Sequence, residues 1–198
     1  MLDEAPRRRE MVVVAVLFEG GLALLALGLG WLADCPPWQL LHWTWADSLY
    51  GAAATLPLLL VFLLCIHWPI GPLARIKEFA DQAIRPMFRS CSYLELAAIS
   101  LLAGLGEEML FRGVLQALFN RWLDVWPALA LVSVLFGLLH LITPTYAGFA
   151  GLIGAYLGWL TVLSGNLLAA VICHALYDFF ALCYVVRGPS PRGSTNRR

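Results

Sequence analysis

The segment LLAGLGEEMLFR, residues 101–112, places two acidic residues and one basic residue inside an apolar stretch. Apolar residues continue on both sides, so the pattern predicts one helix from Tyr93 to Leu123. At 1.5 Å per residue this helix is about 45 Å long, which exceeds the roughly 30 Å hydrocarbon core of a bilayer. We therefore expect it to tilt, kink or protrude. Ionisable residues are costly inside a membrane and are functional by default.

The composition of the whole chain excludes an ordinary soluble protein. Of the 198 residues, 61% are hydrophobic and 13% are charged, and the mean hydropathy is +0.77. A soluble domain has about 45–50% apolar and about 25% charged residues. A soluble enzyme, a nucleic-acid-binding protein and a disordered chain are therefore poor interpretations, and no nucleic-acid partner is expected.

Apolar stretches long enough to cross a bilayer recur along the chain. Only helices satisfy their own backbone in lipid without closing a barrel. The sequence therefore predicts an all-α, polytopic membrane helix bundle with about six transmembrane helices. Their approximate bounds are Met11–Ala33, Ser48–Trp68, Tyr93–Leu123, Val125–Ile142, Tyr146–Leu163 and Asn166–Val186. Very short turns separate the last three, which makes them antiparallel neighbours.

Basic residues are distributed unevenly around these spans. The net charge is zero, with 13 Lys and Arg against 13 Asp and Glu. With six spans, Arg112 lies inside the membrane and Arg121 lies at its outer side. The other eleven basic residues lie on the opposite side of the membrane. Because basic residues favour the cytoplasmic side, both termini are expected there, in the plasma (inner) membrane. The eleven are Arg7, Arg8, Arg9, Arg75, Lys77, Arg85, Arg89, Arg187, Arg192, Arg197 and Arg198.

Three of the predicted spans carry, among their ionisable residues, six candidates for a shared site. They are Glu107, Glu108 and Arg112 in the third, His140 in the fourth, and His174 and Asp178 in the sixth. Their occurrence on three helices of the same half of the chain predicts one shared site inside the membrane, with the bilayer as its surroundings.

Helical spacing separates the roles of the third-span residues. Glu108 and Arg112 are four residues apart, so they share a helix face and are expected to form a structural ion pair. Glu107 is rotated by about 100° from Glu108 and does not share that face. Its carboxyl group is therefore available to exchange a proton.

Two further pairs have the same four-residue spacing. His174 and Asp178 are expected to hydrogen-bond or to act together. The ring of Phe136 is expected to pack beside the imidazole of His140 and to exclude water from it.

Three short motifs in this half of the chain resemble those of a known family. Glu107-Glu108-Met109-Leu110-Phe111-Arg112 resembles the E-E-x-x-x-R motif of the CPBP family of intramembrane endopeptidases. Phe136-Gly137-Leu138-Leu139-His140 matches its F-x-x-x-H motif, and His174-Ala175-Leu176-Tyr177-Asp178 matches its H-x-x-x-N/D motif. The family includes type 2 CAAX prenyl proteases and bacterial relatives tied to bacteriocin immunity. The resemblance runs from about Ser92 to Val186.

The resemblance implies hydrolysis of a peptide bond inside the membrane. Glu107 and His140 would activate a water molecule, while His174 and Asp178 would stabilise the tetrahedral oxyanion or position the peptide. An ionised Asp repels an oxyanion, so Asp178 must be protonated, orient His174 or bind a cation. We favour orientation of His174, the supporting role that carboxylates play for catalytic histidines.

Two mechanisms are compatible with these residues, and they differ in whether a metal ion takes part. In one mechanism Glu107 is the general base, His140 holds the water and no cofactor is required. In the other, Glu107, His140 and His174 bind zinc, which lowers the pKa of the bound water. We favour the metal-free mechanism because no single helix carries a dedicated ligand cluster.

The resemblance also suggests a division of the chain. Residues 1–90 hold N-terminal membrane helices, residues 91–187 the catalytic core and residues 188–198 a disordered tail. Within the first part, Leu73–Met87 alternates charged and apolar residues, which predicts an amphipathic helix on the cytoplasmic surface. The alternative for this segment is a solvated linker.

Other functions use the same buried residues. A non-hydrolytic membrane protein, such as a proton-coupled carrier or a scaffold or immunity factor, would use them as a proton relay or for packing. A membrane cytochrome would use His140 and His174 as haem ligands. For the protease, the expected substrate is a membrane-associated peptide or a lipidated, for instance prenylated, protein.

Overall fold

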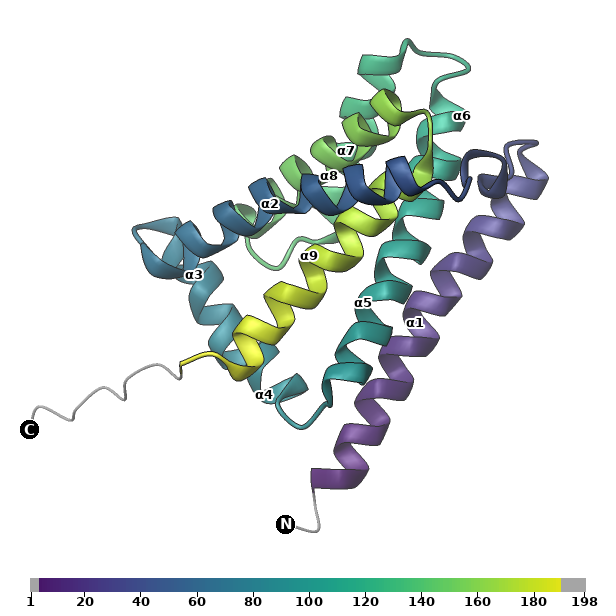
Figure 1. The fold of residues 1–198 in the computed structure, drawn as a ribbon. Helices are drawn as coiled ribbons and strands as arrows, with labels where there is room; N and C mark the ends of the chain where they lie inside the picture. The colour runs from purple at the N-terminus through teal and green to yellow at the C-terminus, as the bar shows by residue number, and fades with distance from the viewer. Residues whose placement is uncertain (1–3, 190–198) are drawn as a thin grey trace, which may run out of the picture.

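Long apolar helices dominate the architecture. The structure is a computed structural model that describes residues 4–189, and every regular element in that range is helical (Figure 1). Helices α1 (Glu4–Leu32), α2 (Trp45–His67), α8 (Pro144–Ser164) and α9 (Leu167–Arg187) contain segments long and apolar enough to cross a membrane. The predicted all-α membrane bundle is confirmed. Residues 190–198 of the predicted tail lie outside the described residues.

The third predicted span is helical but irregular. It runs through α5 (Tyr93–Glu108), the π-helical η3 (Met109–Gln116) and α6 (Ala117–Phe119). The change from α to π geometry occurs directly after the two glutamates. π-Helical turns in a longer helix are frequent at functional sites, because the wider turn rotates the side chains that follow.

The fourth predicted span is shorter than the other apolar helices. Helix α7 (Val125–Leu139) has 15 residues, about 22 Å at 1.5 Å per residue, against the roughly 30 Å hydrocarbon core. Four segments therefore meet the length for crossing, and full passage of the third and fourth spans stays a prediction. All six predicted segments are helical along most of their length.

Two glycines place α5 between its neighbours α1 and α9 (Figure 1). A Cβ on Gly106 would lie 2.5 Å from the backbone oxygen of Glu19 in α1. A Cβ on Gly104 would lie 2.9 Å from the backbone oxygen of Val171 in α9. Such close backbone approach is common between membrane helices with small residues at the interface. The two helices that carry Glu107 and His174 are thereby held in contact.

The remaining helices form two further contacts around this centre. Helix α7 packs against α8, and α2 packs against α9. Gly165 ends α8 with a φ of +63°, a left-handed conformation that glycine adopts without strain, and the chain turns at once into α9. The short turns thus produce the expected neighbouring helices.

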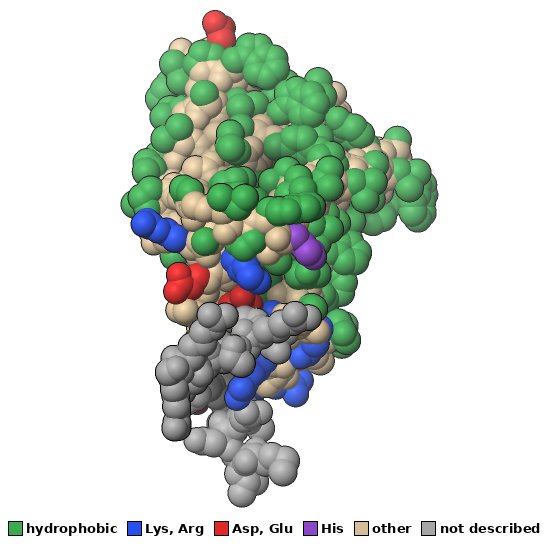
Figure 2. Space-filling model, turned by 90° about the vertical axis from the view of Figure 1, so that its left-hand side faces the viewer, with side chains coloured by type: hydrophobic (Ala, Val, Ile, Leu, Met, Phe, Trp, Pro, Cys, Tyr) green, Lys and Arg blue, Asp and Glu red, His purple; other side chains and the backbone are tan. Residues whose placement is uncertain are grey.

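The amphipathic segment is helical, as predicted. It consists of α3 (Pro72–Phe79), the π-helical η2 (Ala80–Ile84) and α4 (Arg85–Phe88). In Figure 1 it lies at the end of the bundle where α1 begins and α9 ends. Figure 2 shows Lys and Arg side chains gathered toward one end of the visible face, with hydrophobic side chains over the rest. The helical part of the prediction is confirmed, and the position of this segment on the cytoplasmic surface stays a prediction.

Candidate active site

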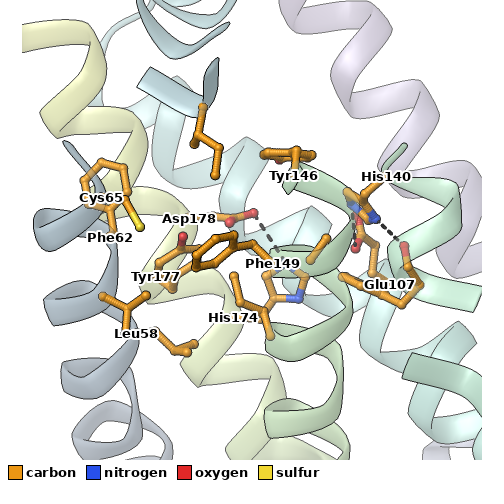
Figure 3. Close-up of a pocket in the computed structure, with 15 residues that line it drawn as sticks. Leu58, Phe62, Cys65, Glu107, His140, Tyr146, Phe149, His174, Tyr177 and Asp178 are labelled. Atoms are coloured by element: carbon orange, nitrogen blue, oxygen red, sulfur yellow. Dashed lines mark hydrogen bonds and ion pairs between the residues drawn. The ribbon is translucent and has the colours of Figure 1, made fainter. Parts of the chain in front are cut away.

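The four predicted catalytic residues line one cavity of about 160 Å³. Glu107 comes from the end of α5, His140 directly follows α7, and His174 and Asp178 lie on successive turns of α9 (Figure 3). The three motifs, separated by up to 71 positions in the sequence, therefore converge. The cavity is also lined by Leu58, Val61, Phe62, Cys65, Ile76, Phe136, Tyr146, Phe149, Ala150, Ile153 and Tyr177.

Glu107 and His140 face one another across the cavity wall. The Oε2 atom of Glu107 lies 3.9 Å from Nε2 of His140. The other ring nitrogen, Nδ1, lies 2.8 Å from the backbone oxygen of Phe136. Because a carbonyl oxygen only accepts hydrogen bonds, Nδ1 carries the proton in this arrangement. The lone pair of neutral His140 is then on Nε2, on the side of Glu107.

The environment of Glu107 leaves one oxygen without a partner. Its side chain is buried, and none of the described residues donates a hydrogen bond to Oε2. A buried polar atom in this condition is costly unless a ligand or water completes it. Phe136 stacks on the His140 ring with a centroid distance of 4.4 Å, as its spacing predicts. Glu107 and His140 therefore offer one binding position for a polar group, beside an apolar wall.

Glu108 and Arg112 form the expected ion pair, fully buried. An N–H of Arg112 donates to Oε1 of Glu108 at 2.8 Å, and a second donates to the backbone oxygen of Gly154 in α8 at 2.8 Å. The guanidinium also lies 4.6 Å from the centre of the Phe136 ring, within cation–π distance. This residue thus connects η3 with α7 and α8.

His174 contacts a carboxyl group through each ring nitrogen. Its Nδ1–H donates to Oε1 of Glu108 at 2.7 Å, while Nε2 lies 3.4 Å from Oδ2 of Asp178. We expected Asp178 to orient this histidine, but the shorter contact comes from Glu108. The sequence carries no local signal for this hydrogen bond, because the two residues are 66 positions apart. Glu108 therefore holds both Arg112 and His174 in place.

The zinc alternative stays a hypothesis, and its three candidate ligands, Glu107, His140 and His174, line the same cavity. A zinc ion needs three or four ligand atoms at about 2.0–2.3 Å. Within residues 4–189, no group of three His, Cys, Asp or Glu side chains is arranged to hold a metal ion. His174 already uses Nδ1 on Glu108, which removes that atom from a ligand set.

Apolar side chains from α2 and α8 complete the cavity. Leu58, Phe62 and Cys65 lie with Tyr177 on the side away from Glu107 and His140 (Figure 3). These residues are not predicted from the sequence, because an apolar residue in a membrane helix carries no local signal of which cavity it lines. The site is therefore polar at one end and apolar at the other.

Fold and site together define a helical membrane protein with a polar cavity enclosed by its helices. The part of the chain that carries the site can be named more closely. Residues 89–180 match the model described as "Type II CAAX prenyl endopeptidase Rce1-like". The match includes all three motifs and is consistent with the resemblance seen in the sequence. No curated protein and no solved structure matches the chain.

Proposed function

We propose that this protein is an intramembrane endopeptidase that hydrolyses a peptide bond with a water activated by Glu107 and His140. The observation that carries the proposal is the 3.9 Å separation of Glu107 Oε2 and His140 Nε2 on the cavity wall. One water oxygen can lie about 2.8 Å from both atoms, an ordinary hydrogen-bond length.

The proton of that water has a defined destination. Glu107 takes it as the water oxygen bonds to the peptide carbonyl carbon, and the carbonyl π electrons move onto oxygen. His140 accepts the second O–H of the water at Nε2 and so sets its direction. The tetrahedral intermediate then expels the amine, whose nitrogen takes the proton from Glu107 as the C–N bond breaks. Glu107 returns to its carboxylate form.

Positioned donors stabilise the oxyanion that forms between these steps. His174 reaches the cavity with Nε2 and, when doubly protonated, donates there to the oxyanion. Its direction is held through Nδ1 by Glu108, whose charge is balanced by Arg112. Asp178 lies beside Nε2 and balances the charge of the imidazolium.

The substrate is a membrane-associated peptide that presents an apolar group. The α2 side of the cavity is apolar, with Leu58, Phe62 and Cys65 in its wall. A lipid chain on a peptide, or an apolar side chain of a membrane peptide, is favoured there by burial of hydrocarbon. A prenylated protein and an unlipidated membrane peptide are the two substrate classes that fit.

We place the cavity mouth and both termini on the cytoplasmic side of the plasma (inner) membrane. Ile76 of α3 lines the cavity, and α3 belongs to the amphipathic segment at the end where α1 begins. This end carries the basic residues that favour the cytoplasm. A cysteine introduced at Trp38 in a cysteine-free chain should react with impermeant maleimide from outside intact cells, whereas one at Arg75 should not.

Cleavage by the purified protein in proteoliposomes tests the proposed activity. Two fluorogenic probes separate the substrate classes: a peptide ending in a farnesylated CAAX sequence and an unlipidated transmembrane peptide with the same reporter. We expect Glu107→Gln to abolish cleavage and Glu10→Gln, a change at an exposed position of α1, to leave it unchanged. Cleavage that persists in Glu107→Gln, or a wild type that cleaves neither probe, would contradict the proposal.

A further inference from the structure

Tyr146 lies beside His140 because of the short turn between α7 and α8. Thr143 caps α8, and its Oγ1 accepts a hydrogen bond from the backbone N–H of Tyr146 at 3.1 Å. The ring centroids of Tyr146 and His140 are 6.4 Å apart, with an interplanar angle of 43°. The turn that ends α7 at His140 therefore also places Tyr146 at the cavity.

A second aromatic contact restrains the Tyr146 ring. Phe79, at the end of α3, lies 5.8 Å from it between ring centroids, with an interplanar angle of 57°. The tyrosine thus contacts one aromatic ring on the amphipathic segment and another on the reactive side. The Tyr146 ring therefore has aromatic neighbours on two different segments.

Tyr146 lines the same cavity as the reacting groups. Figure 3 shows it between Asp178 and His140. Glu107 and Asp178 line the same cavity as Tyr146. By contrast, Tyr177 lies with Phe62 and Cys65 at the apolar end of the same cavity.

The chemistry of the site calls for a donor of this kind. The oxyanion needs hydrogen-bond donors aimed at it, whereas an ionised Asp178 only accepts and repels negative charge. A phenol O–H donates without carrying a charge. Tyr146 therefore carries a hydrogen-bond donor, which Asp178 as a carboxylate lacks.

We propose that Tyr146 is a further catalytic residue, whose hydroxyl donates a hydrogen bond to the oxyanion formed during peptide hydrolysis. This inference rests on the proposed endopeptidase function. The hydroxyl keeps its proton throughout: it shortens its contact with the carbonyl oxygen as negative charge develops and lengthens it when the intermediate collapses.

Tyr146→Phe, compared with Tyr156→Phe, tests the inference. Tyr156 is on the same helix, and its hydroxyl donates to the backbone oxygen of Ala54 at 2.9 Å, outside the lining of the cavity. Loss of one oxyanion donor lowers kcat by about 100-fold. We expect this loss in Tyr146→Phe with KM within about threefold of wild type, and an unchanged kcat in Tyr156→Phe.

A transition-state mimic supplies a readout that packing alone would not change. A peptide aldehyde adds water to become tetrahedral, whereas the corresponding alcohol does not. Tyr146→Phe should weaken inhibition by the aldehyde by about the same factor as kcat and leave inhibition by the alcohol unchanged. Equal weakening of both inhibitors would overturn the assignment, as would a wild-type kcat.

The same assay separates this inference from the proposed function. If wild type cleaves a probe and Glu107→Gln does not, the endopeptidase stands, and a Tyr146→Phe variant at full rate removes only the role of Tyr146. If Glu107→Gln cleaves normally, both proposals fall. Should Tyr146→Phe unfold in detergent, 3-fluorotyrosine at position 146 keeps the ring and changes the donor strength. An unchanged kcat with this analogue would then overturn the inference.

Discussion

His174 in α9 donates from Nδ1 to Oε1 of Glu108 in α5 at 2.7 Å, and that same oxygen accepts from Arg112 at 2.8 Å. One carboxyl oxygen thus joins a histidine of the cavity to a fully buried cation. The second residue of the E-E-x-x-x-R motif is therefore more than a neutralising partner for Arg112. It determines which nitrogen His174 presents to the cavity.

Removing the charge of Glu108 should destabilise the fold strongly. Glu108→Gln leaves the Arg112 guanidinium buried without its counter-ion, and breaking a buried pair in this way costs about 3–5 kcal/mol. Thermal unfolding in detergent measures the loss. Glu108→Gln combined with Arg112→Gln should lose less than the sum of the two single changes. Additive losses would show that the pair does not act as a unit.

Loss of the His140 ring should stop cleavage without unfolding the protein. His140 follows the last turn of α7 and its side chain is partly exposed, so His140→Ala removes few packing contacts. We expect kcat to fall by at least about 100-fold, the lower end of the range for a lost acid–base group. Wild-type-like turnover in this variant would rule out water activation by His140. His42→Ala, at an exposed position outside the lining of the cavity, serves as the control.

The crossing of α1 and α5 should be sensitive to a single methyl group. In Gly106→Ala the added Cβ would lie 2.5 Å from the Glu19 backbone oxygen, so the helices must separate. Overpacking of this kind costs about 1–3 kcal/mol. Gly20→Ala is the matched control on α1, because a Cβ there meets nothing within 4 Å. Equal melting temperatures for both variants would contradict the close approach.

Metal removal should leave hydrolysis intact. The mechanism uses a carboxylate and an imidazole as the groups that activate water, so dialysis against EDTA should not change kcat. Elemental analysis of the dialysed protein confirms that the metal has been removed. A loss of activity that zinc alone restores would instead support the ligand set Glu107, His140 and His174.

Much of the fold follows from patterns within single segments. The length of the apolar stretches predicts the helices. Residues 101–112 predict that one of these helices contains charged side chains. Four-residue spacing predicts the contacts Glu108–Arg112 and Phe136–His140, both of which are present, because residues four apart share a helix face. The convergence of the three motifs was expected only from the cost of isolated polar groups in lipid.

Patterns within single segments do not predict the contacts between helices. The His174–Glu108 hydrogen bond, the apolar wall from α2 and the position of Tyr146 each depend on how distant segments pack. The π-helical turn after Glu108 also has no simple sequence signal, yet it changes the direction of the side chains that follow.

The sequence by itself determined that this is a helical membrane protein with ionisable residues on three of its helices. Lipid provides no hydrogen bonds, so length, polarity and spacing along one helix are sufficient for that conclusion. Only the tertiary structure decided which carboxyl group holds His174, which nitrogen of His140 faces Glu107 and which tyrosine lies beside His140. Those choices depend on separations of a few ångströms between helices, set by the close approach at Gly104 and Gly106 and by the turn before Tyr146.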